Sequence, residues 1–287
     1  MRAPTPSLPA NLSPGRTKST FPYLFALFFF AAFVLSYRAA QVDPSVLFET
    51  EGRQNLWKFV TGMFPPELSW DFLQLMARPA VETIQISIMG TAFAVVIGLP
   101  FGLLATGSLT WSGILHEMAP SQTRRFLGLG SYAIARALLS VLRSIPEFVW
   151  AFIFVRAVGL GPFPGVLAIG VSYGGILGKV YSEILESVNP RPIEALQATG
   201  ASKLTIVLYG LLPQAFPNLV AYTLYRWECA IRASAILGFV GAGGIGQQIE
   251  ISMRMFNFHE ILTLIGILAL LVAGVDALSA RVRKAIL

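Results

Sequence analysis

The sequence predicts an all-α integral membrane protein with about six transmembrane helices. Of its 287 residues, 55% are apolar and only 13% are charged, and the mean hydropathy is +0.66. A soluble domain carries about 25% charged residues, so a soluble protein of this size could not cover its surface with so few charges. Aromatic and β-branched residues are too abundant for a disordered chain. A bilayer is the environment that fits this composition.

Six apolar segments approach the roughly 20 residues that a helix needs to cross a bilayer. The expected spans are residues 21–37, 80–106, 145–158, 163–180, 214–237 and 261–278. The first is expected to be an uncleaved anchor, because the residues that follow it offer no pair of small residues for signal cleavage. Residues 126–144 are expected to form an amphipathic helix before the third span, with a break at Pro146, since proline interrupts a helix.

The distribution of basic residues predicts the orientation. The N-terminal tail, residues 1–20, and the residues after 278 each hold three Lys or Arg and no acid. Such residues usually stay in the cytoplasm. We therefore expect both termini there, an external segment at 38–79 and a transmembrane domain at 80–287. This interpretation accounts for the net charge of +6 without a nucleic-acid partner.

Residues for catalysis or cofactor binding are scarce. The only histidines, His116 and His259, are far apart, and Cys229 is the single cysteine. A metal site needs more ligands than these. Gly178-Lys179 lacks the flanking glycine and the Ser or Thr of a phosphate-binding loop. We therefore expect no enzyme, no metal and no cofactor in this chain, and any energy for transport must come from a gradient or from another subunit.

A polar stretch, residues 181–213, is expected to form a cytoplasmic helical hairpin. Its first helix should begin after Pro190 and Pro192, with Glu194 in the first turn, where a carboxylate meets the positive helix end. Ala195 is small enough for another surface to approach closely, and Gly200 is placed to end the helix in the left-handed conformation. A second helix is expected to run over 202–212 and to stop before Pro213.

This stretch resembles the EAA loop of binding-protein-dependent ABC importer permeases, whose pattern is E-A-A-x3-G-x9-I-x-L-P. The matching positions are Glu194, Ala195, Gly200, Leu212 and Pro213. Two positions depart, because Leu196 replaces the second alanine and Gly210 replaces the isoleucine. In that family the loop is a coupling helix that docks on the ATPase subunit, and the resemblance implies the same role for residues 194–200.

Two further segments resemble the small ABC importer permeases for methionine and for phosphonates: Leu142-Arg143-Ser144-Ile145-Pro146-Glu147 and Val240-Gly241-Ala242-Gly243-Gly244-Ile245-Gly246. Two segments of the fifth span, Tyr225-Arg226-Trp227-Glu228 and Arg232-Ala233-Ser234, resemble the phosphonate permeases of the PhnE type and not the methionine type. The resemblance covers about residues 80–287. The resemblance implies a MetI-like type I ABC importer permease fold in a bacterial inner membrane. The implied cargo is a phosphonate or a related oxyanion, phosphite or phosphate.

The same resemblance implies the partners: a second permease copy in a homodimer, two ATPase subunits that bind ATP and Mg²⁺, and a periplasmic or lipid-anchored binding protein. A permease for methionine or another amino acid is the close alternative. A gradient-driven secondary transporter would be expected to have inverted repeats, and no such repeat is visible. A membrane-embedded enzyme is disfavoured by the missing catalytic residues.

Three charged residues fall inside the fifth expected span: Arg226, Glu228 and Arg232. Charges in a bilayer are costly, so these side chains should face protein or water. Glu228 and Arg232 are four residues apart and are expected to pair, which leaves Arg226 less satisfied. A guanidinium suits phosphonate oxygens. Two interpretations stay open, a contact with the cargo and a purely structural ion network. Arg143 and Glu147 are likewise expected to pair.

A glycine-rich run follows the fifth span, over residues 241–246. No strand precedes it, so a dinucleotide-binding turn is not expected. Glycine lets a backbone bend sharply or approach a neighbour closely. We expect a flexible re-entrant turn near the external mouth, and Gly241, Gly243 and Gly244 are candidate residues of an external gate.

Overall fold

The computed structural model describes residues 21–41, 43, 45, 49–111 and 122–286, and all regular structure in these ranges is helical. Six of the helices are long and apolar enough to cross a membrane. The predicted all-α membrane fold is therefore confirmed. The predicted tail at 1–20 and His116 lie outside the described residues. The chain forms two compact units, residues 1–58 and residues 59–287, which we describe separately.

The first unit contains α1 (Phe21–Ala39) and most of α2 (Thr50–Gly62). Helix α1 lies where the first span was expected and extends it by two residues. None of its side chains is buried by the rest of the chain, which leaves an almost wholly apolar surface for lipid or a partner. Helix α2 lies within the predicted segment 38–79 and is more polar than α1.

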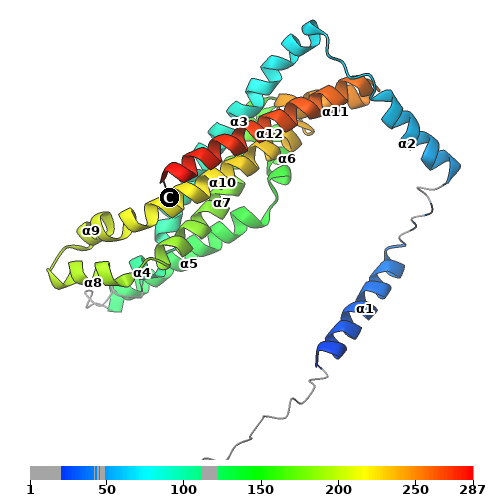
Figure 1. The fold of residues 1–287 in the computed structure, drawn as a ribbon. Helices are drawn as coiled ribbons and strands as arrows, with labels where there is room; N and C mark the ends of the chain where they lie inside the picture. Colours follow the sequence, from blue (N-terminus) through cyan, green and yellow to red (C-terminus); the bar gives the residue numbers. More distant parts are fainter. Residues whose placement is uncertain (1–20, 42, 44, 46–48, 112–121, 287) are drawn as a thin grey trace, which may run out of the picture. The chain divides into compact units, whose positions relative to one another are not determined.

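The second unit is a helical bundle (Figure 1). Helices α3, α5, α7, α10 and α12 run side by side, with α8 and α9 at one end and α11 toward the other. The bounds are α3 (Trp70–Leu104), α4 (Gly107–Thr110), α5 (Gln122–Ser144), α6 (Glu147–Val158), α7 (Pro162–Glu186), α8 (Pro190–Ala198), α9 (Lys203–Ile206), α10 (Leu212–Gly238), α11 (Gly244–Arg254) and α12 (Phe258–Ile286). A π-helical turn at Val207–Leu211 joins α9 to α10.

Helix α7 lies at the centre of the bundle. About two thirds of its membrane-spanning part is buried, the largest share of any span. Its longest contact is with α3, and both helices present glycines to each other: Gly90, Gly98 and Gly102 on α3, and Gly170, Gly174 and Gly178 on α7. Small residues let membrane helices approach closely, so dispersion contacts replace the hydrophobic effect that is absent in lipid.

The third span differs from the prediction. Helix α5, expected to be only an amphipathic approach, is itself long and apolar enough to cross a membrane over Arg125–Ser144. Helix α6, expected to be the span, has twelve residues and is about 18 Å long, too short for a core of about 30 Å. The expected break is present, and the indole N–H of Trp150 donates to the Leu142 carbonyl at 3.3 Å, the acceptor that Pro146 cannot serve.

Three other boundaries are corrected. Helix α3 begins at Trp70 rather than near residue 80, because about three turns that include polar residues precede the apolar span. The helix after α8 does not stop before Pro213. The π turn leads directly into α10, where Pro213 occupies the first turn and its missing N–H is tolerated. Finally, helix α11 begins within the glycine run and fills part of the interval before the last expected span, 261–278.

Candidate coupling helix and translocation site

The predicted short helix is present as α8. Asn189 caps its start, since its side-chain oxygen accepts a hydrogen bond from the Arg191 N–H at 3.1 Å. Pro190 is the first helical residue, a position that needs no N–H. Because the helix begins there, Glu194 is its fifth residue, and the predicted place in the first turn was wrong. The Glu194 side chain is exposed.

The end of α8 follows the prediction closely. Gly200 has a φ of +75°, the left-handed conformation. Its N–H donates to the Gln197 carbonyl at 2.9 Å, and the Ala201 N–H donates to the Leu196 carbonyl at 3.4 Å. These two bonds form the Schellman motif. A Cβ added at Gly200 would meet nothing within 4 Å, so only backbone strain, not crowding inside this chain, opposes a side chain there.

Helix α8 has one buried and one open face. Ile193 is 7% exposed and packs into the bundle core. Glu194, Ala195 and Ala198 are exposed on the outer side. Leu212 and Pro213, the last two positions of the motif, begin α10 instead and contribute to the turn that follows the π helix. The structure thus leaves Glu194 and Ala195 exposed on the outer side of α8.

The two departures from the motif pattern lie next to each other. A Cβ added at Gly210 would lie 2.9 Å from Leu196 Cδ1. Leu196 is larger than the alanine of the pattern, and Gly210 is smaller than the isoleucine. The exchange therefore conserves volume at the contact between α8 and the π turn, the kind of core change that costs least. Sequence reasoning treated them as two independent mismatches.

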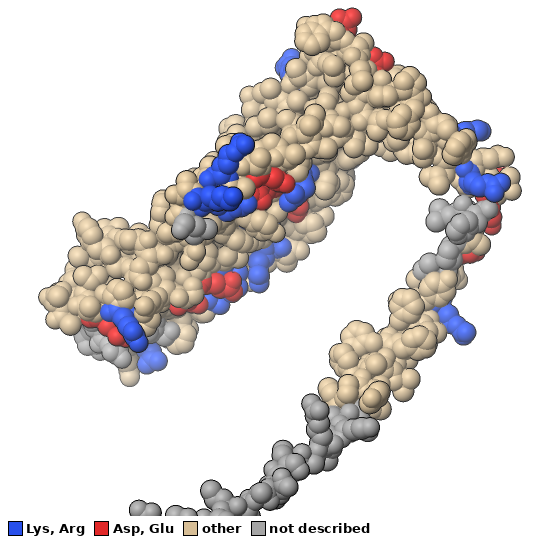
Figure 2. Space-filling view, viewed as in Figure 1, with Lys and Arg blue, Asp and Glu red and all other residues tan. Residues whose placement is uncertain are grey.

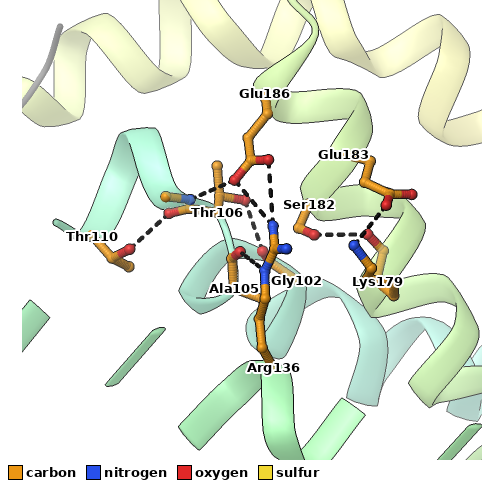
Figure 3. Close-up of polar contacts among 10 residues, drawn as sticks. Gly102, Ala105, Thr106, Thr110, Arg136, Lys179, Ser182, Glu183 and Glu186 are labelled. Atoms are coloured by element: carbon orange, nitrogen blue, oxygen red, sulfur yellow. Dashed lines mark hydrogen bonds and ion pairs between the residues drawn. The ribbon is translucent and has the colours of Figure 1, made fainter. Parts of the chain in front are cut away.

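A polar network holds the end of α7, directly before α8 (Figure 3). The Glu186 carboxylate accepts the Gly107 N–H at 2.7 Å and forms an ion pair with Arg136 at 3.3 Å. The Arg136 Nε–H donates to the Ala105 carbonyl at 3.2 Å. These contacts tie α4, α5 and the end of α3 to α7. The sequence prediction missed both residues, although Arg136 interrupts an apolar face and Glu186 precedes the proline that opens α8.

The charged residues of α10 pair differently from the prediction. Glu228, 8% exposed, forms an ion pair with Arg283 of α12 at 2.6 Å, and Arg232 lies 4.0 Å from Asp276 of α12. The expected Glu228–Arg232 pair is therefore wrong, because α12 supplies a closer partner to each. Figure 2 shows a group of charged side chains near the C-terminal end of α12.

Arg226 is left without a carboxylate among the described residues, as predicted. Its guanidinium carbon lies 3.9 Å from the centre of the buried Tyr173 ring, a cation–π contact between α10 and α7. Its Nε–H is buried and has no hydrogen-bond partner in the described part of the chain. The aromatic ring of Tyr173 therefore stabilises one face of the guanidinium, while its Nε–H donor has no acceptor in the described part of the chain.

The two charged residues on either side of the break between α5 and α6, Arg143 and Glu147, do not pair. No ion pair joins Arg143 to Glu147 in the described chain, so the expected pair is wrong. The interruption at Ile145 and Pro146 removes the regular helical register that would place residues four apart on one face. Arg143 is exposed and borders a cavity of about 600 Å³ between α5 and α7.

The glycine run is held, not free. Gly241, Gly243 and Gly244 all have positive φ angles, of +88°, +82° and +73°. The Gly244 N–H donates to the Glu82 carboxylate and the Ile245 N–H to the Thr83 hydroxyl, both at 2.9 Å. The expected flexibility is therefore wrong for this conformation, because α3 supplies acceptors to the first N–H groups of α11, which would otherwise be unsatisfied.

The run also borders a cavity. Its volume is about 480 Å³ and its wall includes Gly241, Arg156 and Arg254, the last paired with Glu250. The Gly161 N–H donates to the Gly241 carbonyl at 2.9 Å, which ties the run to the turn before α7. Of the three candidate gate glycines, only Gly241 lines this cavity, whose wall comes from α6, the end of α10 and α11. Gly244 instead bonds to Glu82 of α3.

Residues 131–286 match the family described as "Binding-protein-dependent transport system inner membrane component". The chain is 39% identical over 236 residues to a putative phosphite transport system permease protein, HtxC, of Stutzerimonas stutzeri, covering 82% of this chain and 77% of the relative. It is 37% identical over 220 residues to the phosphite transport system permease protein PtxC of the same organism, covering 77% and 74%. The chain belongs to this family of inner-membrane transport components.

Solved structures agree on the fold of this permease. It is similar to a chain of the MetNI methionine ABC transporter in an inward-facing conformation, with a TM-score of 0.63 and 26% identity, over 77% of this chain and all of that one. An amino acid ABC transporter shares the fold at a TM-score of 0.59 and 15% identity, over 75% and 95%. The permease is thus a multi-pass transport subunit of an ABC importer, not an enzyme, and works with an ATPase and a substrate-binding protein.

Proposed function

We propose that this permease imports phosphorus oxyanions, namely phosphite, phosphonates or phosphate. The observation that carries the proposal is the high similarity over most of the chain to two permeases named for phosphite. A probable D-methionine permease of Pasteurella multocida is 29% identical over only 61% of the chain. The fold is common to both cargo classes, so it does not discriminate between them.

The charges inside the bundle support an anionic cargo. Arg226 lacks a carboxylate partner in the described chain and retains an unused buried donor. A guanidinium presents a planar fork that matches two oxygens of a tetrahedral oxyanion. Glu228 and Arg232, in contrast, are matched by α12 and serve a structural ion network. We assign Arg226 to the translocation path and the other two to the contact between α10 and α12.

The face of α8 around Glu194, Ala195 and Gly200 is proposed to dock on the ATPase. Its exposed side chains are small, and hydrogen bonds cap both of its ends, so this helix can act as a rigid element that transmits movement of the ATPase. The Arg136–Glu186 contact, directly before it, anchors α7 and so passes motion of α8 to the spans. Leu212 and Pro213 would set the turn by which α10 receives the same motion.

The complete transporter is proposed to contain two permease copies and two ATPase subunits, which bind ATP and Mg²⁺, with a periplasmic or lipid-anchored binding protein. Both permease termini and α8 would face the cytoplasm of a bacterial inner membrane, with basic residues retained on that side. Residues 38–79 would lie outside. The glycines 241, 243 and 244 would form part of the external gate, between the cavity at Arg156 and the bundle.

Growth on defined phosphorus sources tests the cargo. A strain that lacks its own phosphorus oxyanion importers and expresses this permease with its ATPase and binding protein should grow on phosphite or methylphosphonate as sole phosphorus source. Phosphite requires a strain able to oxidise it. The matched control is a methionine auxotroph that expresses the same complex. Rescue of the auxotroph without uptake of any phosphorus oxyanion would favour the amino-acid alternative and contradict the proposal.

Labelling tests the orientation. In a chain whose only cysteine, Cys229, is replaced by alanine, a cysteine introduced at the exposed Ala198 should react with an impermeant thiol reagent only after the cells are opened. A cysteine at Trp57, in the segment proposed to be external, should react in intact cells. The opposite pattern would reverse the proposed topology.

Cross-linking tests the gate. A disulfide between the glycine loop and α3, formed through Gly243→Cys and Glu82→Cys, should block transport if the loop moves as a gate.

A further inference from the structure

We propose that the oxyanion cargo binds in the groove between α5 and α7, part-way across the membrane, with Arg143 as its central contact. The proposal rests on the function proposed above and adds a second arginine to the path of Arg226. The groove has a volume of about 600 Å³. Its wall consists of Ser140, Arg143, Ser144, Ile176, Lys179, Val180 and Glu183. No residue of this groove was assigned a role by the motif resemblance.

Arg143 lies at mid-depth in the bundle. Its backbone nitrogen is opposite Gly175, where an added Cβ would lie 2.8 Å away, and Gly175 is midway along the 25-residue span α7. A charged side chain at such a depth is costly unless it faces protein or a water-filled cavity. Arg143 has no ion pair within the described chain, so the groove that it borders provides the polar environment for its charge.

The charges of the groove are unequal. Lys179 is matched by Glu183, with Nζ and Oε1 2.6 Å apart, as Figure 3 shows on α7. Arg143 is not matched. With two basic side chains and one acidic side chain, the groove has a net charge of one positive unit, carried by the Arg143 guanidinium. A cavity with net positive charge and low-dielectric walls concentrates anions.

The chemistry of the wall suits a tetrahedral oxyanion. The guanidinium offers a fork of parallel donors for two oxygens. The hydroxyl of Ser140 lines the same groove as a further donor, whereas the hydroxyl of Ser144 donates to the Val141 carbonyl at 2.9 Å. Glu183 opposes tight binding, since a carboxylate repels the cargo and holds part of the charge of Lys179. A transport site benefits from this balance, because a tightly held anion would not leave again.

The groove also lies at a broken helix. Helix α5 ends at Ser144 and α6 begins at Glu147, with Ile145 and Pro146 between them outside regular structure. Transporters build substrate sites from interrupted membrane helices, because the interruption frees polar groups at mid-depth. Here the freed Leu142 carbonyl is taken up by Trp150. The arginine next to it keeps its donors for a ligand.

Reconstituted transport tests the proposal. The complete complex, with ATPase and binding protein, is placed in proteoliposomes, and import of labelled phosphite, methylphosphonate and phosphate is measured together with ATP hydrolysis. Arg143→Gln should lower the cargo imported per ATP hydrolysed at least about tenfold, the effect of one lost charge-assisted hydrogen bond. Arg143→Lys should lose less. Hydrolysis stimulated by the loaded binding protein should persist in both.

Two further variants keep the test decisive. Ser140→Leu fills the groove without changing its charge and should also lower import per ATP, so the proposal stands or falls even if Arg143→Gln fails to assemble. Arg78→Gln removes an exposed arginine of α3 outside the groove and should leave import unchanged. Unchanged import per ATP in Arg143→Gln or in Ser140→Leu would overturn the groove assignment.

Two controls separate the alternatives. If Arg143 binds a lipid phosphate, the loss in Arg143→Gln should appear only in vesicles that contain anionic phospholipid, and that outcome overturns the assignment to cargo. An equal loss in vesicles made of phosphatidylcholine alone supports it. If the wild-type complex imports none of the three anions, the proposed function fails. If it imports them and the variants do so equally well, only the groove assignment fails.

Discussion

Gly200, after α8, and Gly246, in α11, both lack a side chain, but for opposite reasons. Around Gly200 there is open space, and its φ of +75° is what requires glycine. Gly246 is packed so closely against α10 that an added Cβ would overlap the Ala235 carbonyl oxygen. Gly200 therefore shapes a surface that is open to a partner, and Gly246 allows α10 and α11 of the same chain to pack closely.

The comparison extends to the surroundings of each glycine. The α8 end of the bundle is capped by its own local hydrogen bonds and exposes small residues outward. The glycine run before α11 is held by long-range bonds, from Gly244 and Ile245 to residues of α3 that lie 162 positions earlier. Changes near α11 should therefore affect stability, and changes near α8 should affect coupling to a partner.

The largest effect on stability is expected for Gly246→Ala. The added methyl group meets backbone of α10, which cannot move aside as a side chain can, so the cost should reach about 3 kcal/mol or more. Thermal unfolding of the detergent-solubilised permease, followed by size-exclusion chromatography, measures it. Gly266→Ala on α12 is the matched control, because a Cβ there meets nothing within 4 Å. Equal melting temperatures for the two variants would contradict the packing argument.

The next largest effect is expected for Thr83→Val. It keeps the shape of a fully buried side chain but removes the hydroxyl that accepts the Ile245 N–H. A buried donor left unsatisfied costs about 1–3 kcal/mol. The same thermal unfolding assay applies, with Thr83→Ser as the control that retains the oxygen. A valine variant as stable as the serine variant would show that this bond does not hold the glycine run.

Leu196 and Gly210 should show a smaller, coupled effect. Gly210→Ile alone crowds Leu196, and Leu196→Ala alone leaves a gap at the same contact. The double variant restores the family pattern, so its destabilisation should be less than the sum of the two by about 1 kcal/mol, within the range for residues in contact. Simple additivity of the three melting temperatures would mean that the two departures are unrelated.

Gly200→Leu should have a modest effect on stability and a large effect on function. A left-handed residue with a side chain costs about 1–2 kcal/mol, and no neighbour is displaced. If α8 docks on the ATPase, the leucine should nevertheless uncouple ATP hydrolysis from import in proteoliposomes. Ser187→Leu, at the exposed end of α7, is a control for added bulk outside the docking face. Normal import per ATP in Gly200→Leu would contradict the docking proposal.

Local signals in the sequence predicted local structure well. The proline pair and Gly200 predicted both ends of α8 to within a residue or two, because caps depend on neighbours in the chain. Pro146 predicted the break before α6. The same local approach misplaced the third span, since apolarity alone did not reveal that α5, despite Arg136 and Arg143, is the longer helix. Glu186 of α7 and the Ala105 carbonyl bind Arg136, and Arg143 borders the groove beside α7.

Composition, spacing and capping residues thus determined by themselves that this chain is a helical membrane protein, where most of its spans lie, and that it carries a segment resembling the EAA loop of the importer family. They could do so because helix formation, span length and capping are set within a few turns of chain. Only the tertiary structure decided which charges pair. Arg283 reaches Glu228 across 55 positions of sequence, and Arg143 is left alone beside α7. The partner of a membrane charge is chosen by packing between helices, and no spacing along one helix can reveal it.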